Sequence, residues 1–210
     1  YEPDCTKTAF PDSGFYKLYD DTAALVFFAG KPGPPYMLGH AHCDLLSFEL
    51  SIAGEPTIVN SGTYAYQSEL RPYFRSTAAH NTATVDGDEQ MECWAEHRVA
   101  RGVREVRVER ATECCITASF RNYKGHLHRR TVILSDGSLS VEDRTDREDI
   151  SLVQCFHQAR PGLVRIVPVP GCVKRNSLVE ASCLLGEIHS SSLVEVSRFG
   201  SVASNILYGP

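Results

Sequence analysis

Hydrophobic and polar residues alternate with a period of two over residues 45–52. The apolar side of this run consists of Leu46, Phe48, Leu50 and Ile52. Because successive side chains of a strand point to opposite faces, the pattern predicts a β-strand with one face in a hydrophobic core. A turn over residues 53–56 and a second short run over residues 57–60 extend this prediction to a β-hairpin.

Short apolar runs of the same kind recur along the rest of the chain. They cover residues 15–19, 23–29, 82–86, 103–108, 116–120, 131–134, 139–141, 151–157, 163–169, 177–185 and 192–198. Turn-forming residues separate them, and Asp136-Gly137 lies between two of them as in a tight hairpin. No segment shows the sustained 3.6-residue periodicity of an amphipathic helix. The pattern therefore predicts an all-β fold, a large antiparallel β-sandwich.

Residues 61–80 interrupt this rhythm. Polar, aromatic and basic residues are dense in this segment, and it has little apolar periodicity. A loop of this length inside a compact domain is usually functional or disordered, and the aromatic content argues against disorder. We therefore expect functional residues in this segment.

Size and charge narrow the possible partners. The chain has 210 residues and a net charge of -5, and we expect residues 1–210 to form a single domain. It has neither a basic surface for nucleic acid nor a long apolar run, so we expect no nucleic acid and no membrane as partner. It begins with Tyr1-Glu2-Pro3, without Met or a signal peptide, and we interpret it as a fragment or processed product.

The eight cysteines give no clear metal motif. No C-x-x-C pair occurs, which argues against a zinc ribbon, and Cys114 and Cys115 are adjacent. The favoured interpretation is reduced cysteines that pack as small hydrophobic residues. A disulfide framework remains an alternative, so the redox compartment stays open.

Two histidines precede the run at 45–52. If the strand extends back through His40 and His42, both imidazoles point to the same face. In the hairpin Asn60 lies near His42, and His80 ends the irregular segment. Zinc binds nitrogen, sulfur or carboxylate oxygen, so His42, His80 and an oxygen of residue 60 are one candidate metal site. Polar surface histidines are the other interpretation.

Four linked segments resemble the heparinase II/III-like family. They are HAHCDLLSF at 40–48, NSGTYAY at 60–66, RSTAAHNT at 75–82 and DGDEQ at 86–90. In that family a C-terminal β-sandwich packs on an N-terminal α/α toroid, which carries most of the sugar-binding cleft. This chain resembles the sandwich alone and lacks the toroid. The toroid of the same full-length protein is therefore an expected partner.

The resemblance implies a polysaccharide lyase, a carbon–oxygen lyase that cleaves uronic-acid polysaccharides such as glycosaminoglycans or alginate by β-elimination. An acidic polysaccharide is therefore the expected substrate. The reaction must neutralise the uronate carboxylate, remove the C5 proton and protonate the leaving oxygen. Arg, Asn and protonated His suit the first task, and His or Tyr suit the other two.

Carried over residue by residue, the resemblance assigns His40 to catalysis or carboxylate binding. It assigns His42, His80 and residue 60 to a zinc ion. The family usually has Asp at the third ligand position, whereas this chain has Asn60. A neutral amide is a poorer zinc ligand than a carboxylate, so we expect a weakened metal site.

Other residues of these segments have two interpretations each. Arg75 is expected to bind a substrate carboxylate or sulfate, or else to hold its own loop. Tyr64 stacks on a sugar ring or packs beneath the loop. Asn81 contacts substrate or orients the loop, and Asp44 is expected to be a hydrogen-bond partner of a histidine rather than a ligand.

Three functions fit these features. The first is the β-sandwich half of a polysaccharide lyase, inactive alone because the toroid supplies further catalytic groups. The second is a non-catalytic carbohydrate-binding or assembly module. The third, a stand-alone metal hydrolase, is disfavoured because the motif lacks an acidic base. A periplasmic or secreted location in a bacterium is the expectation that the lyase resemblance carries.

Overall fold

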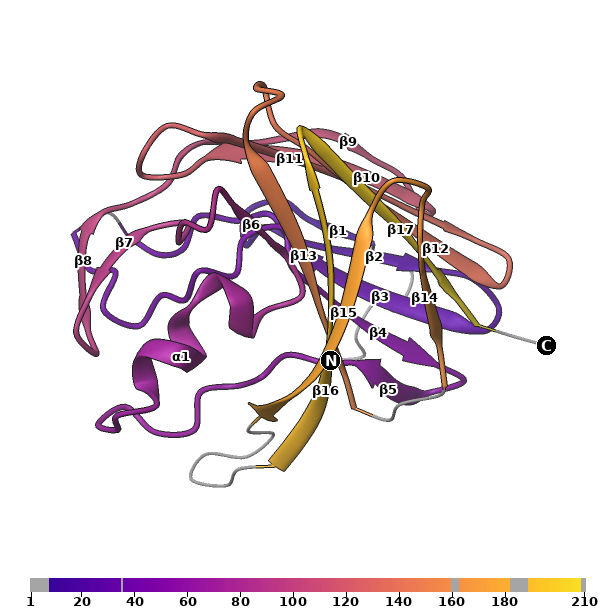
Figure 1. Cartoon of the computed structure of the whole chain (residues 1–210), viewed down its shortest axis with the longest axis horizontal. Coiled ribbons are helices and arrows are strands. Elements are labelled where there is room, and N and C mark those ends of the chain that lie inside the picture. Colours follow the sequence, from indigo (N-terminus) through magenta and orange to yellow (C-terminus); the bar gives the residue numbers. More distant parts are fainter. Residues whose placement is uncertain (1–7, 35, 160–162, 182–188, 209–210) are drawn as a thin grey trace.

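The computed structural model describes residues 8–34, 36–159, 163–181 and 189–208. This part of the chain consists almost entirely of antiparallel strands in two large sheets, as Figure 1 shows. The predicted all-β antiparallel sandwich is therefore confirmed. None of the helices in these residues is long and apolar enough to cross a membrane.

The first sheet has nine strands and carries the segments around the histidines. Its order is β1 (Ala9–Phe10), β2 (Phe15–Tyr19), β3 (Ala23–Phe28), β4 (Phe48–Ile52), β5 (Glu55–Ile58), β13 (Ser151–Gln158), β16 (His189–Phe199) and β15 (Val173–Ala181). The ninth strand, β6 (Ala83–Val85), pairs with β13 beside this path. The predicted hairpin is present as β4 and β5.

The second sheet has six strands and covers the first. Its order is β14 (Arg165–Pro168), β17 (Ser201–Leu207), β12 (Ser138–Arg144), β11 (Leu127–Ser135), β10 (Cys115–Arg121) and β9 (Arg104–Ala111). The predicted tight hairpin at Asp136-Gly137 joins β11 to β12. The prediction for residues 177–185 is met up to Ala181, and residues 182–185 lie outside the described part.

The hydrophobic core fills the space between the two sheets. Phe27, Phe48 and Leu50 of the first sheet are fully or almost fully buried, and so are Val132 and Val141 of the second. Burying one such side chain stabilises the fold by roughly 1.5–3 kcal/mol. The alternation predicted for 45–52 follows from this core, because Phe48 and Leu50 are buried while Glu49 between them is exposed.

The strand begins later than predicted. β4 starts at Phe48, so His40 and His42 lie in an irregular segment and not on a strand. The reason is a turn in which the amide of Ser47 bonds to the carbonyl of Asp44 and Leu46 adopts a left-handed φ of 57°. This turn buries Leu45 and Leu46 together, which strict alternation does not allow.

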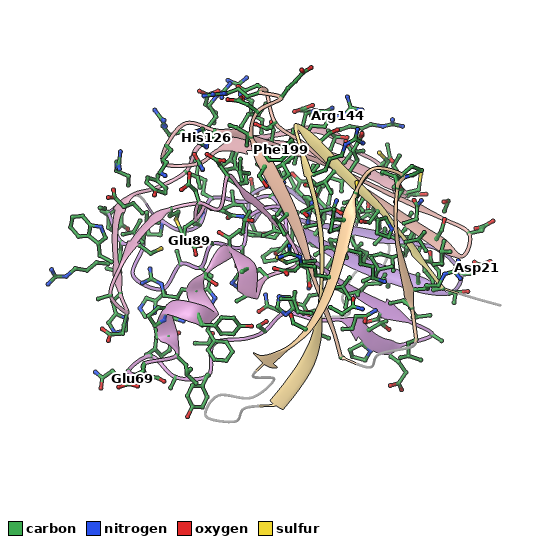
Figure 2. The ribbon with its side chains drawn as sticks, viewed as in Figure 1. Asp21, Glu69, Glu89, His126, Arg144 and Phe199 are labelled. Atoms are coloured by element: carbon green, nitrogen blue, oxygen red, sulfur yellow. The ribbon has the colours of Figure 1, made fainter. Side chains whose placement is uncertain are left out.

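A small lobe extends from one end of the sandwich. It contains helix α1 (Arg71–Arg75), the 3-10 helix η1 (Thr77–Ala79) and a hairpin of β7 (Glu92–Trp94) and β8 (Arg98–Arg101). Figure 2 shows Glu89 in this lobe, near helix α1. Its carboxylate accepts hydrogen bonds from the Thr77 amide at 2.6 Å and hydroxyl at 2.7 Å. Glu89 thereby fixes the start of η1, and with it the approach to His80.

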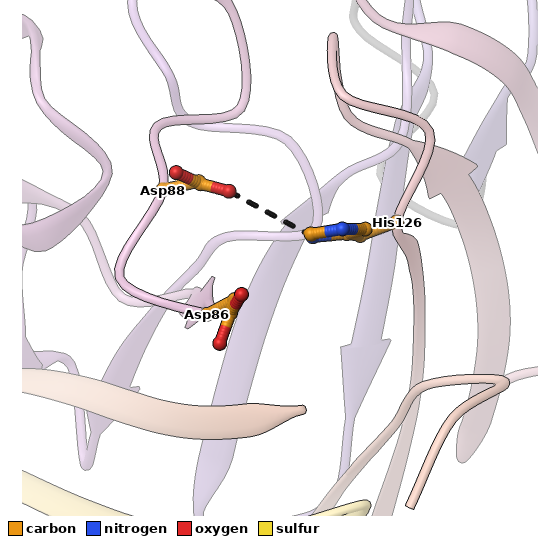
Figure 3. Close-up of side chains that lie close together, drawn as sticks. All are labelled: Asp86, Asp88 and His126. Carbon is orange, nitrogen blue, oxygen red and sulfur yellow. Dashed lines mark ion pairs between the residues drawn. The ribbon is translucent and has the colours of Figure 1, made fainter. Parts of the chain in front are cut away.

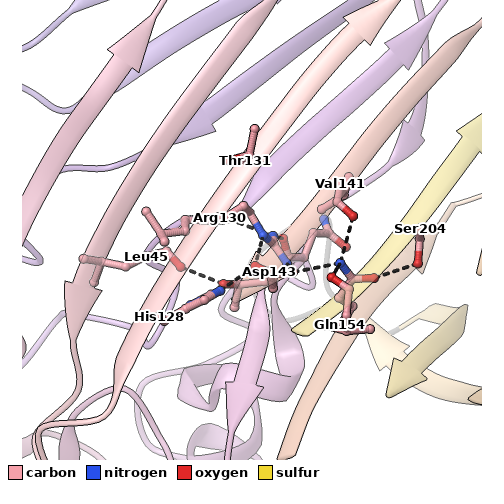
Figure 4. A network of polar contacts seen from close by, with 12 residues as sticks. Leu45, His128, Arg130, Thr131, Val141, Asp143, Gln154 and Ser204 are labelled. Carbon is pink, nitrogen blue, oxygen red and sulfur yellow. Dashed lines mark hydrogen bonds and ion pairs between the residues drawn. The ribbon is translucent and has the colours of Figure 1, made fainter. Parts of the chain in front are cut away.

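A buried ionic network centred on Arg130 and Asp143 (Figure 4) ties the second sheet to the backbone that flanks the predicted site. The guanidinium of Arg130 makes two hydrogen bonds to Asp143, of 2.7 and 2.8 Å, and Gln154 also donates to Asp143 at 2.8 Å. The remaining nitrogen of Arg130 donates to the carbonyls of Leu46 and Asn81, at 2.9 and 2.7 Å. Arg130 therefore holds the backbone on both sides of the predicted site.

Candidate functional site

An open cavity of about 340 Å³ lies where the small lobe meets the first sheet. Residues 40–42 and Asp44 form one wall, and Asn60, Gly62 and Thr63 form another. Phe28 and Pro32 complete the lining. The cavity therefore brings together residues that are twenty positions apart in the sequence.

Two buried side chains hold residues 40–45 in place. Arg75 donates to the carbonyls of Ala41 and Ala95, each at 3.2 Å, and its own carbonyl accepts from the amide of Cys43. Gln90 bonds to both backbone groups of Leu45 at 2.9 Å. This geometry matches the interpretation that Arg75 holds its own loop, and substrate binding by Arg75 stays a prediction.

His42 is held by a buried arginine that the sequence analysis did not single out. Nη1 of Arg71 donates to Nε2 of His42 at 2.7 Å. Because a guanidinium can only donate, Nε2 is unprotonated and the ring hydrogen of neutral His42 is on Nδ1. Burial, Arg71 and Arg75 lower the pKa of His42 to about 4. At neutral pH His42 is therefore an uncharged ring with an N–H group on the cavity wall.

Arg71 itself is an uncompensated buried cation. Its side chain is fully buried, and its Nε and Nη2 atoms have no hydrogen-bond partner among the described residues. The guanidinium lies over the ring of Tyr66, 4.9 Å from the ring centroid, which gives a cation–π contact. No carboxylate neutralises it in the described structure, so its positive potential extends to the cavity wall.

Asn60 and His80 form the second pair of the cluster. Nδ2 of Asn60 lies 3.1 Å from Nδ1 of His80, and the Asn60 oxygen accepts from the amide of Gly62 at 2.7 Å. Gly62 has a left-handed φ of 80°, which suits this tight turn. Burial, followed by the neighbouring His42, lowers the pKa of the fully buried His80.

The three predicted zinc ligands therefore come together. The ring centroids of His42 and His80 are 5.3 Å apart, and Asn60 bonds to His80. Their donor atoms are nevertheless poorly arranged for a cation, because Nε2 of His42 faces a guanidinium and Nδ1 of His80 faces an amide N–H. Zinc binding stays a prediction that this arrangement does not support.

His40 lies at the exposed rim of the cavity. Its ring meets the edge of Tyr66 in a T-shaped contact, with centroids 5.3 Å apart. Tyr66 thus touches both His40 and the Arg71 guanidinium. Of the two predicted site histidines on this wall, His40 is the more accessible to a ligand.

Two other predicted substrate contacts are occupied within the protein. Tyr64 has a left-handed φ of 61°, and its ring packs on Phe74 with centroids 6.0 Å apart. Asn81 is buried and donates to the carbonyls of Phe48 and Val59 at 2.9 Å, while its oxygen accepts from the amide of His157 at 2.7 Å. Substrate contact by Tyr64 and Asn81 stays a prediction.

Asp44 lines the cavity without a histidine partner. No hydrogen bond joins it to a histidine among the described residues, contrary to the expectation from the sequence. Burial raises the pKa of the Asp44 carboxyl to about 7. A different histidine, His157, supports the cavity wall. Its ring bonds to the Ser61 hydroxyl at 3.2 Å and to the carbonyl of Ala78 at 2.8 Å.

A second group of possible metal ligands lies away from the cavity (Figure 3). One ligand atom each of Asp86, Asp88 and His126 lie within 4.8 Å of one another. Lys124 forms an ion pair with Asp88 at 2.5 Å, and His126 lies 3.7 Å from the same carboxylate. The Lys124 ammonium already supplies a positive charge to Asp88.

Comparison with known proteins gives consistent matches. The profile of a family described as heparinase II/III-like, C-terminal, matches residues 3–168. The chain is similar to a mutant heparan sulfate lyase HepC from Pedobacter heparinus, with 18% identity and a TM-score of 0.75, over 100% of this chain and 37% of that one. It is also similar to a heparinase III, with 14% identity and a TM-score of 0.69, over 94% and 35% of the two chains.

The chain thus spans little more than a third of the solved structures that it matches. At these identities the likeness establishes the fold. No curated protein sequence matches the chain.

Proposed function

Since the chain belongs to the heparinase II/III-like family, we propose that it is the C-terminal part of a polysaccharide lyase. The proposed substrate is an acidic polysaccharide that contains uronic acid, and the proposed reaction is β-elimination. A helical domain of the same longer protein supplies the other wall of the cleft. The proposal concerns the complete protein, because this chain corresponds to about 37% of a matched lyase chain.

One observation carries the proposal: an accessible histidine and a neutral one share a cavity wall backed by a buried, unpaired arginine. A uronate carboxylate entering the cavity would meet the N–H of His42 and the potential of Arg71 behind it. Drawing carboxylate charge toward these groups makes the C5 proton more acidic. That is the first requirement of the elimination.

His40 is the residue of this chain that we assign to proton transfer. It lies at the cavity rim, where a substrate can approach it, and Tyr66 supports one edge of its ring. Positioned proton transfer of this kind contributes roughly 10²- to 10⁴-fold to a rate. The proton acceptor and donor that complete the reaction are expected on the helical domain, so this chain alone should have no turnover.

The test compares the complete protein with its His40→Ala variant on heparan sulfate, hyaluronan and alginate, following the absorbance of the unsaturated uronate product. We expect His40→Ala to lower kcat by about 10²-fold or more on the preferred polymer. The control is His97→Ala. His97 is another exposed residue whose ring lies beside Tyr66, with ring centroids 6.3 Å apart, but it does not line the cavity. Equal activity of both variants, or turnover by residues 1–210 alone, would contradict the assignment.

A non-catalytic carbohydrate-binding or assembly module is the second candidate function. Asn60 favours it, because this amide stands where the resemblance calls for a carboxylate. The two functions differ in one measurement. A binding module would retain polysaccharide affinity in the complete protein yet release no unsaturated product from any of the three polymers.

A further inference from the structure

Arg71 and Asn60 occupy the directions from which a metal ion would approach His42 and His80. We propose that this cavity functions without a bound metal, with Arg71 supplying the positive charge and Asn60 the hydrogen bond that orients His80. The proposal rests on the proposed function for its relevance to catalysis, but its geometry is independent of the substrate.

His42 has no free lone pair to offer a zinc ion. A zinc ligand must offer an unprotonated ring nitrogen, and the unprotonated nitrogen of His42 is Nε2. Nη1 of Arg71 lies 2.7 Å from that atom, where a zinc ion would lie about 2.0–2.1 Å from it. A guanidinium at this distance both takes the lone pair and repels a second cation.

The Asn60 amide turns its nitrogen, and not its oxygen, toward His80. The amide of Gly62 donates to Oδ1 of Asn60 at 2.7 Å, which turns Nδ2 toward His80. An amide nitrogen carries two hydrogens and cannot bind zinc. Rotating the amide to offer its oxygen would bring Nδ2 against the Gly62 N–H, two donors facing each other. A carboxylate has an acceptor at both ends and meets no such conflict.

His80 is also held by a nitrogen donor, and it gains no further ligand among the described residues. Since Nδ1 accepts from Asn60, the ring hydrogen of His80 is on Nε2, which is buried and has no hydrogen-bond partner among the described residues. Among these residues, no further His, Cys, Asp or Glu completes a three-ligand group with His42 and His80. Both imidazoles are thus held in fixed orientations by nitrogen donors of the protein.

The charge of this cavity equals that of a zinc site with one carboxylate ligand. A zinc ion with one carboxylate ligand carries a net charge of one positive unit, and so does Arg71 with the neutral Asn60. A cavity of either kind presents one positive unit behind its histidines to an anionic substrate. The neutral amide of Asn60 and the Arg71 guanidinium, which has no carboxylate partner among the described residues, therefore together give the cavity this charge.

The test measures zinc directly, without substrate. Purified protein is dialysed against micromolar zinc chloride, and the bound metal is determined by elemental analysis for wild type, His42→Ala and His80→Ala. We expect all three to hold the same amount of zinc, since zinc bound at thiols elsewhere does not depend on these rings. Stoichiometric zinc in wild type that is lost in either variant would overturn the proposal.

One gain-of-site variant and its matched control sharpen the test. Asn60→Asp combined with Arg71→Met should bind zinc about 100-fold more tightly than wild type, in a manner that depends on His42 and His80. Arg71→Met alone keeps the amide and serves as the matched control, with no such gain. Circular dichroism establishes that each variant is folded. A folded double variant with no gain in affinity would contradict the replacement of a zinc site.

The histidine tautomers give a reading in the wild-type protein alone. Long-range ¹⁵N–¹H spectra should show a hydrogen on Nδ1 of His42 and on Nε2 of His80, unchanged by zinc chloride. The opposite tautomers, or a shift of both rings on adding zinc, would refute the proposal. If the spectra agree but the complete protein lacks lyase activity, the proposed function fails while this inference stands.

Discussion

Nη1 of Arg130, a residue of the second sheet, lies 2.7 Å from the carbonyl oxygen of Asn81, next to His80. The same side chain is bonded to Asp143 through its two other nitrogens and is fully buried. The position of His80 therefore depends on a side chain from the opposite sheet. Contacts of this kind lead to five testable predictions about stability, titration and thiol chemistry.

Arg130→Met should destabilise the protein strongly. The substitution leaves the Asp143 carboxylate buried without its main counter-charge, which costs roughly 3–5 kcal/mol. The matched control is Arg129→Met, one residue earlier, whose ion pair with Glu109 is partly exposed and is worth about 0–1 kcal/mol. Urea denaturation measures both free energies of unfolding. Similar losses in the two variants would show that the buried pair is not special.

Mild acid should destabilise the protein partly through His42. The pKa of His42 is about 4 when folded, below the value of about 6.5 in an unfolded chain, so the folded protein binds fewer protons in this window. The contribution of neutral His42 to the free energy of unfolding is complete above about pH 6.5. It is lost as the pH falls toward 4, by about 3 kcal/mol at most.

His42→Gln should therefore lose less stability than wild type between these two pH values, as measured by urea denaturation at several pH values. His97→Gln, at an exposed ring, is the control and should follow wild type. Parallel pH profiles for wild type and His42→Gln would contradict the prediction.

Arg71→Met should raise the pKa of His42. Burial is the larger cause of the low pKa and remains in the variant, so the value should stay below that of a free histidine. A titration of the His42 ring by NMR gives the result directly. Arg98→Met, at an exposed arginine of β8, should leave His42 unchanged.

Gln90→Ala should weaken the cavity wall. The variant leaves the buried amide of Leu45 without its partner, which costs about 1–3 kcal/mol, while the carbonyl of Leu45 keeps the hydrogen bond from the Thr82 hydroxyl. Gln67→Ala, at an exposed position of the loop before α1, is the control. Thermal or urea unfolding tests the difference, and a neutral Gln90→Ala would mean that Gln90 is not a brace.

Cys43 and Cys93 should form a disulfide with a disulfide oxidant such as oxidised glutathione. Their sulfur atoms are 3.8 Å apart, about 1.8 Å more than a disulfide requires. The bond to Cys43, together with Arg75, lowers the pKa of Cys93, which attacks first. Cys43 then displaces the reagent's second thiol, so two protein thiols are oxidised as one glutathione disulfide is reduced.

Peptide mapping by mass spectrometry should find the Cys43–Cys93 link in preference to any link of Cys114, which is exposed on the second sheet's side of the molecule. Cys93→Ser removes the attacking thiol and should leave Cys43 reduced. A Cys43 that remains reduced in wild type after the same treatment would contradict the prediction.

The sequence predicted the sandwich well because burial between two sheets imposes a period of two. Phe48 and Leu50 follow that period, since they pack on the opposite sheet. Residues 40–47 escaped it because the left-handed turn at Leu46 is set by contacts from Gln90 and Arg130, which lie far away in the sequence.

The sequence predicted which residues of the candidate site lie together, but not the hydrogen bonds that join them. His42, Asn60 and His80 share one cavity region, as the spacing and the family resemblance indicated. Arg71 was missed because nothing in its local sequence distinguishes it from Arg75, one helical turn later. A detectable signal was the basic pair at positions 71 and 75 in a segment with no nearby acidic partner other than Glu69.

Strand β6 has a consequence for how the protein loses its site. Residues 83–85 form this strand next to Asn81, and they pair with β13 near the middle of the first sheet. The cavity is thus attached to one of the last parts of the sandwich to open. The amide hydrogens of Asp86 and Cys155, which bond across this pair to the carbonyls of Ser151 and Thr82, should exchange with solvent as slowly as those of the core. On heating, the cavity and the sandwich would then unfold in one cooperative transition. No intermediate would form in which the sandwich is folded and the cavity is lost.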